Sequence, residues 1–138
     1  MGRLPRPRVP QRPVTRVVLD AGALIALERG DRRMAAVVSR LHERDVEFVV
    51  PAGCVAQSWR RPQRQARLAR FLRSPRVTTS PLDERDARAV GELLAVSGTS
   101  DVVDAHVALC AVRGSATVFT SDPDDLARLA PGLHLVAV

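Results

Sequence analysis

The chain has 138 residues, which is enough for one ordinary domain with a core of its own. All 21 basic residues are arginine, and against 15 acids they give a formal net charge of +6. The absence of lysine excludes a Walker A phosphate loop and Schiff-base catalysis, because both need a lysine side chain. Cys54 and Cys110 are too few and too far apart for a disulfide framework or a zinc site, so we expect them to be small hydrophobic residues.

The charge is unevenly distributed along the chain. Residues 60–76 contain seven arginines and no acid, whereas residues 83–125 contain nine acids and three arginines. This bipolar pattern suits a protein that handles both a metal ion and a polyanion. No apolar run is long enough to cross a membrane, and the N-terminus lacks the apolar region of a signal peptide. We therefore expect a cytoplasmic protein.

Residues 1–14 are rich in arginine and proline, and four prolines remove backbone donors there. This composition predicts a disordered extension. Residues 15–138 then form the single predicted domain.

Strand-like and helix-like segments alternate through that domain. The expected strands are 15–19, 46–50, 76–78, 116–120 and 133–136. The expected helices are 23–28, 51–60, 83–96, 101–112 and 123–130, and Ser100 is the expected cap of the helix at 101–112. Two further helices are expected, one that Asp31 caps and one that begins at Pro62. This alternation predicts an α/β fold with a central, mostly parallel sheet flanked by helices.

Acidic residues follow the predicted strands at the edge where ligands gather in parallel sheets. Asp20 follows the first strand, where it is expected to cap little, and Asp122 follows the strand at 116–120. Asp101 and Asp104 share the first turn of the helix that precedes that strand. Carboxylates about 5–6 Å apart repel by roughly 3 kcal/mol, so such a cluster calls for shared protons or a cation. All-oxygen ligands favour Mg²⁺ or Mn²⁺. The alternative is that Asp101, Asp124 and Asp125 are ordinary first-turn acids.

Four segments carry a family resemblance: VVLDAGALIAL, VPAGCVAQSWR, DVVDAHVALCA and VFTSDPDDL. In this order and spacing they resemble a PIN domain, specifically the VapC-like toxin ribonucleases, over about Val14 to Val138. The resemblance implies a PIN-like fold and a Mg²⁺- or Mn²⁺-dependent endoribonuclease that hydrolyses RNA phosphodiester bonds with metal-activated water. It also implies the toxin role in a toxin–antitoxin pair, with a cognate antitoxin as partner, and a homodimer.

The resemblance also implies roles for individual residues. Asp20, Asp104 and Asp122 match the metal-binding acids of the family, with Thr120 as an accompanying hydroxyl. Gln57 stands where the family usually has glutamate. Either Asp101 supplies the missing acid, or the metal binds more weakly, or activity is lost. His106 lies only two residues from Asp104 on a helix, so we expect it to point to another face.

Two alternative functions remain open: a catalytically impaired PIN-fold module that binds RNA or a partner, and an RNA-processing nuclease without an antitoxin. Arg60, Arg64 and Arg67 are spaced as one stripe on the predicted helix. That stripe is a solvated helix face, a contact for the RNA backbone or a contact for an acidic antitoxin segment. We also expect the helices at 23–27 and 34–41 to line a groove for a partner helix.

Overall fold

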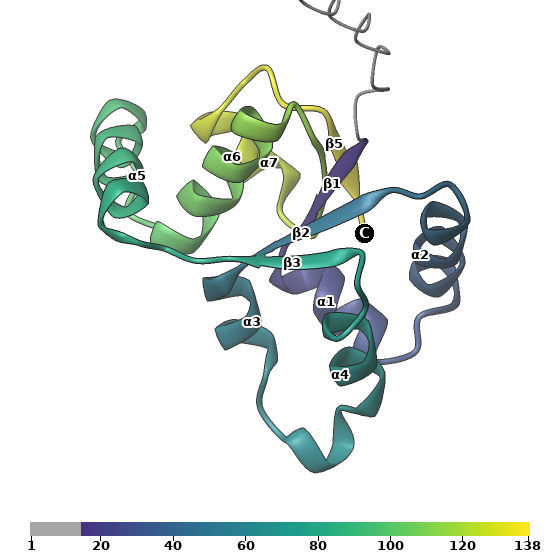
Figure 1. Ribbon diagram of the computed structural model, residues 1–138. Coiled ribbons are helices and arrows are strands. Elements are labelled where there is room, and N and C mark those ends of the chain that lie inside the picture. The colour runs from purple at the N-terminus through teal and green to yellow at the C-terminus, as the bar shows by residue number, and fades with distance from the viewer. Residues whose placement is uncertain (1–14) are drawn as a thin grey trace, which may run out of the picture.

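A computed structural model describes residues 15–138 of the chain (Figure 1), so the predicted N-terminal extension lies outside the described residues. The sheet consists of β1 (Arg16–Leu19), β2 (Glu47–Pro51), β3 (Val77–Ser80), β4 (Thr117–Thr120) and β5 (Leu135–Ala137). Its order is β3-β2-β1-β4-β5, and all four neighbouring pairs are parallel. The predicted α/β fold with a parallel sheet is confirmed.

Helices connect the strands and cover both faces of the sheet. They are α1 (Ala21–Glu28), α2 (Arg32–Glu43), α3 (Ala52–Ser58), the 3₁₀ turn η1 (Pro62–Arg64), α4 (Ala66–Leu72), α5 (Glu84–Ser97), α6 (Val102–Gly114) and α7 (Pro123–Leu129). In Figure 1, α1, α3 and α4 lie below the sheet as drawn, while α6 and α7 lie above it and α5 packs outside α6. Two layers are what right-handed crossovers are expected to give, because the strand order runs outward in both directions from β1.

The core sits on both faces of the central strand. Val17, Val18 and Leu19 of β1 are all buried, as a continuous apolar run in a parallel sheet predicts. The small buried residues Ala105 and Ala108 of α6 belong to the same core and leave room for the helix to approach the sheet. Within the described part of the chain, no single helix is long and apolar enough to span a membrane; α5 and α6 meet that criterion only as a pair bent by 105°.

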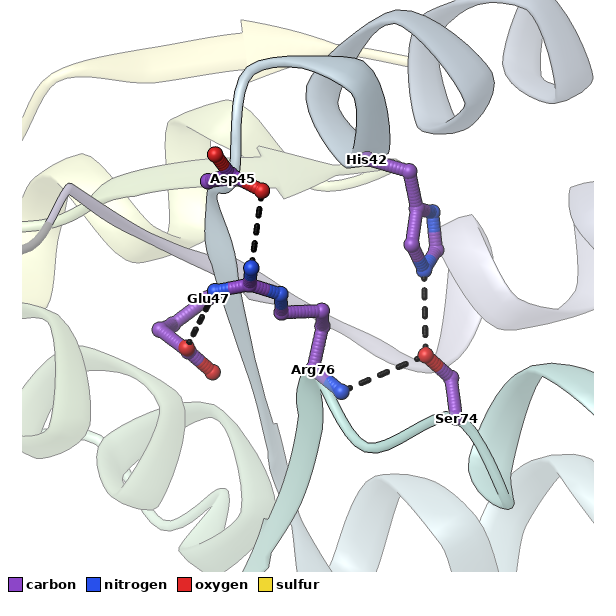
Figure 2. Close-up of polar contacts among 5 residues, drawn as sticks. All are labelled: His42, Asp45, Glu47, Ser74 and Arg76. Atoms are coloured by element: carbon purple, nitrogen blue, oxygen red, sulfur yellow. Dashed lines mark hydrogen bonds and ion pairs between the residues drawn. The ribbon is translucent and has the colours of Figure 1, made fainter.

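At the amino edge of the sheet, acidic side chains are paired with arginine (Figure 2). Arg76 donates to Asp45 Oδ1 at 2.7 Å and to Glu47 Oε1 at 3.1 Å, which joins the beginnings of β2 and β3. Ser74 Oγ accepts from the Arg76 backbone amide and lies 3.1 Å from His42 Nε2. Acids at this edge are therefore neutralised by a cation of the protein itself.

Two sequence-based predictions about helix boundaries are wrong. The helix expected from Pro62 onward is broken at Gln65, whose backbone angles are −115° and 40°, so Arg60, Arg64 and Arg67 do not form one helical stripe. The Arg67 guanidinium instead donates to the Glu28 carbonyl oxygen of α1. Asp101, not Ser100, caps α6, because its side chain reaches the Asp104 amide.

Candidate active site

Asp20 joins two strands at the carboxyl edge of the sheet. Its Oδ1 accepts from the Ala23 amide at 2.9 Å, and its Oδ2 accepts from the Ser121 amide at 3.2 Å. The residue is 5% exposed. The expectation that Asp20 caps little is therefore wrong: it is the N-cap of α1 and also holds the chain after β4. Two backbone donors fix its carboxylate in place.

Gly22 allows this close approach of α1 to the end of β4. A Cβ atom at Gly22 would lie 2.1 Å from Ser121 Oγ and 3.3 Å from Asp20 Oδ1. Any other residue would push the first turn of α1 away from Ser121. Neither Gly22 nor Ser121 was expected at the site, although a glycine two residues after a strand-terminal aspartate permits such a close approach.

Asp104 lies half-buried in the first turn of α6. The pKa of its carboxyl group is raised from the ordinary 3.8 to about 6, first by burial and then by the charges of neighbouring carboxylates. Those carboxylates belong, in decreasing order of effect, to Asp101, Asp122, Asp125 and Asp20. The structure therefore brings five acids near one another.

Asp122 follows β4 and is exposed. Its backbone amide donates to the buried Thr120 Oγ1 at 2.9 Å, so the hydroxyl fixes the main chain at that point. Although Asp122 occupies the N-cap position of α7, its side chain caps no amide of that helix. The Asp122 carboxylate is therefore available to a ligand.

A hollow of about 250 Å³ opens beside Asp104. Asp101, Asp125 and Arg128 line it together with Thr99, Ser100, Asp104 and Leu129. Asp125 lies in the first turn of α7, as predicted, but it also lines this hollow, and its charge contributes to the raised pKa of Asp104. Its place beside Asp104 could not be read from the sequence, because it depends on how α7 packs on α6.

Gln57 is exposed on α3 and lies three residues beyond Cys54. The Cys54 thiol is buried, and its pKa is raised to about 12, first by burial and next by the charge of Asp20, with a smaller contribution from Asp104. The buried side of α3 therefore lies close to these two acids. Residues three apart share a helix face, so Gln57 lies on the Cys54 side of α3, at its exposed end.

His106 belongs to a different part of the protein. It is 1% exposed, and its Nε2 has no hydrogen-bond partner among residues 15–138. Burial lowers its pKa, and the charges that act on it are those of Asp86, Arg113 and Asp83. These residues lie on or beside α5 and at the end of α6, away from the acid cluster, which agrees with the expected direction of His106.

The carboxylate oxygens of this site are the type of ligand that a hard divalent cation prefers, but they do not surround one common position. Among the described residues, no three His, Cys, Asp or Glu side chains lie close enough together to hold a metal ion as they stand. None of the ion pairs in residues 15–138 involves Asp20, Asp101, Asp104, Asp122 or Asp125. Oxygen ligands are what Mg²⁺ and Mn²⁺ prefer, and a cation would relieve the repulsion that raises the pKa of Asp104.

A family model described as "PIN domain" matches residues 17–131, which cover β1 through α7. The chain belongs to the PIN domain family. A search of the curated proteins finds no significant match.

Two solved structures resemble this PIN domain. The crystal structure of VapBC2 from Rickettsia felis, bound to a DNA fragment from its promoter, aligns with a TM-score of 0.63 and 18% identity over 90% of this chain and 99% of that chain. The structure of FitAB bound to an IR36 DNA fragment aligns with a TM-score of 0.61 and 18% identity over 88% of this chain and 94% of that chain. At this level of identity, the alignments establish the fold.

Proposed function

We propose that this PIN domain is a Mg²⁺- or Mn²⁺-dependent endoribonuclease and the toxin of a cytoplasmic toxin–antitoxin pair. The observation that carries the proposal is the negative electrostatic field at Asp104: burial and the charges of four other carboxylates raise the pKa of this residue. The amino edge of the same sheet pairs its acids with Arg76, whereas these acids have no such partner among residues 15–138. A cluster of carboxylates without ion-pair partners at the ligand-binding edge of a parallel sheet favours a cation-dependent function.

The residues of the site have different proposed roles. Asp20 is held by two backbone amides and provides a fixed carboxylate, whereas Asp104 and Asp122 are less constrained and would complete the metal ligands. Gln57 offers a carbonyl oxygen, and Asp101 keeps one carboxylate oxygen beyond the one that caps α6. A bound divalent cation would supply polarisation of the scissile phosphodiester and activation of a water molecule.

The direct test is cleavage of single-stranded RNA by the purified protein. We expect fragments in the presence of Mg²⁺ or Mn²⁺ and intact RNA in EDTA. The Asp20→Asn and Asp104→Asn variants should leave the RNA intact, while Glu92→Gln, an exposed change on α5, should cleave like the wild type. RNA that stays intact with the wild type under all metal conditions would favour the alternative of a binding module, which Gln57 motivates.

A groove of about 570 Å³ between α2 and α4 fits the antitoxin. Leu27, Val38 and Phe71 supply apolar surface, and the groove is also lined by Arg32, Arg67 and Arg70. This combination suits an amphipathic partner helix with acidic residues on its flank. The VapBC2 structure, which this fold resembles, shares its name with the VapC-like toxins that the sequence motifs resemble, and this supports the proposal.

Co-expression with the product of a neighbouring short reading frame tests the antitoxin proposal. Ala35 and Ala36 are both exposed on α2, but only Ala35 lines the groove. We expect Ala35→Arg to abolish co-purification and Ala36→Arg to preserve it. A complex that survives both changes would place the partner elsewhere, and the absence of any partner gene would favour an RNA-processing nuclease.

The homodimer is also a proposal. Val96 and Val102 are 89% and 45% exposed at the corner between α5 and α6, where large apolar side chains are costly to leave in water. We expect the protein to sediment as a dimer, and Val96→Asp to shift it to a monomer.

A further inference from the structure

The segment between α3 and α4 is an ordered loop with a basic and aromatic outer surface. Trp59 is the C-cap of α3 and is 36% exposed, and Arg60, Arg61 and Arg64 are exposed next to it. None of these arginines forms an ion pair within the described part of the chain. We define the Trp59–Arg64 loop as residues 59–64.

A buried glutamine builds this loop. Gln65 is 7% exposed; its Oε1 accepts from the amides of Arg60 and Arg61, both at 2.8 Å, and its Nε2 donates to the Ser58 carbonyl oxygen at 2.7 Å. The Arg64 amide also donates to the Arg61 carbonyl oxygen at 2.9 Å. Three side-chain hydrogen bonds from one buried residue fix the backbone of the loop, so its arginines project from a defined platform and not from a flexible linker.

The loop continues directly from the helix that borders the acid cluster. Cys54 of α3 is close enough to Asp20 and Asp104 for their charges to raise the pKa of its thiol, and Gln57 follows about one turn later. Trp59 is two residues beyond Gln57, so the loop begins at the end of the helix whose other end lies at the acids. In Figure 1 it lies below α3 and α4, on the same side of the sheet as α1.

We propose that the Trp59–Arg64 loop is a binding platform for single-stranded RNA, on which Trp59 stacks with a base and Arg60, Arg61 and Arg64 contact phosphates. This inference rests on the proposed function, since it names how the substrate of that site is held. An exposed aromatic ring beside unpaired cations is the combination that binds single strands without reading sequence. A base in a duplex is already stacked on its neighbours, so the Trp59 ring favours single strands.

Trp59 is the only tryptophan and the chain has no tyrosine, so its fluorescence reports on this loop alone. The experiment titrates a twelve-nucleotide oligouridylate into the full-length protein in EDTA, where cleavage is not required. We expect the oligonucleotide to quench Trp59 fluorescence, and a twelve-base-pair RNA duplex or a polyglutamate peptide to quench it much less. Equal quenching by the duplex or the peptide would overturn the assignment to single-stranded RNA.

Variants then locate the contact by fluorescence anisotropy of a labelled oligouridylate. We expect Trp59→Ala to weaken binding about tenfold and Trp59→Phe to weaken it less, because phenylalanine still stacks. Replacing Arg60, Arg61 and Arg64 together by alanine should make the salt dependence of binding weaker. The negative slope of the log association constant against log salt concentration should become smaller in magnitude by about 2, at roughly 0.7 for each phosphate contact. Arg44→Ala, an exposed change after α2 at the opposite edge of the sheet, is a control for the loss of one arginine away from the loop and should leave affinity nearly unchanged.

These outcomes separate the inference from the nuclease proposal. If the wild type binds through the loop but no metal supports cleavage, the platform stands and the nuclease proposal fails. If the wild type cleaves RNA while Trp59→Ala and the triple arginine variant bind as tightly as wild type, the platform is wrong. Circular dichroism of each variant confirms that it is folded, and the arginine changes affect only exposed side chains.

Discussion

Asp20 and Ser121 lie 101 positions apart in the sequence, yet the Asp20 carboxylate accepts a hydrogen bond from the Ser121 amide at 3.2 Å. The same carboxylate caps α1 through the Ala23 amide. One buried side chain therefore joins the ends of β1 and β4 and begins a helix. Asp20 consequently supports the fold as well as the proposed metal site, which distinguishes it from Asp104.

The Asp20→Asn variant should be less stable than the wild type by about 1–3 kcal/mol. Asparagine keeps an oxygen for the Ala23 amide, but its NH₂ group would then face the Ser121 amide, donor against donor. Urea unfolding in EDTA measures the loss. An unchanged free energy of unfolding would mean that the contact with Ser121 contributes nothing, and loss of cleavage in this variant could then be assigned to the site alone.

The Asp104→Asn variant should be more stable than the wild type at neutral pH without metal. The folded protein holds the Asp104 pKa near 6, above its ordinary value of 3.8, so the wild type loses stability as pH rises from about 4 through 6. Asparagine removes that loss. Because the side chain is only half-buried, we discount the full effect for solvent screening and expect a gain of about 1 kcal/mol at pH 7.5.

Unfolding at two pH values checks the origin of this gain. The difference between Asp104→Asn and wild type should shrink to a small fraction near pH 4, where the carboxyl group of the folded wild type is protonated and that of the unfolded chain is about half protonated. A gain that persists unchanged at pH 4 would point to packing and not to charge. A loss of stability at pH 7.5 would contradict the raised pKa.

The Gln57→Glu variant should bind Mg²⁺ more tightly, by about fivefold, and cleave RNA faster at limiting metal. A carboxylate about 4 Å from a divalent ion gains several kcal/mol at an effective dielectric near 20, but desolvation and repulsion from the other acids remove most of it. Isothermal titration with Mg²⁺ compares the two proteins, with Gln63→Glu in the exposed turn η1 as the control. Equal affinities for all three proteins would show that Gln57 does not reach the cation.

The sequence predicted the fold well, because the pattern of apolar strands and amphipathic helices is local information. It also indicated that acids after β1 and β4 would gather at one edge, since parallel strands end together. It failed where a side chain makes a distant contact. The break at Gln65 and the bond from Asp20 to Ser121 depend on partners that no spacing rule identifies. The helix expected from Pro62 onward is interrupted for this reason.

The rate of RNA cleavage as a function of Mn²⁺ concentration is the most direct test of the proposed metal site. For the wild type and for Glu92→Gln, we expect a rate that rises with Mn²⁺, saturates and returns to zero in EDTA. For Asp104→Asn, which should remain folded and be more stable, we expect no saturable rate at any Mn²⁺ concentration. The same Mn²⁺ dependence in Asp104→Asn and wild type, or wild-type cleavage that persists in EDTA, would contradict a metal site built on these carboxylates.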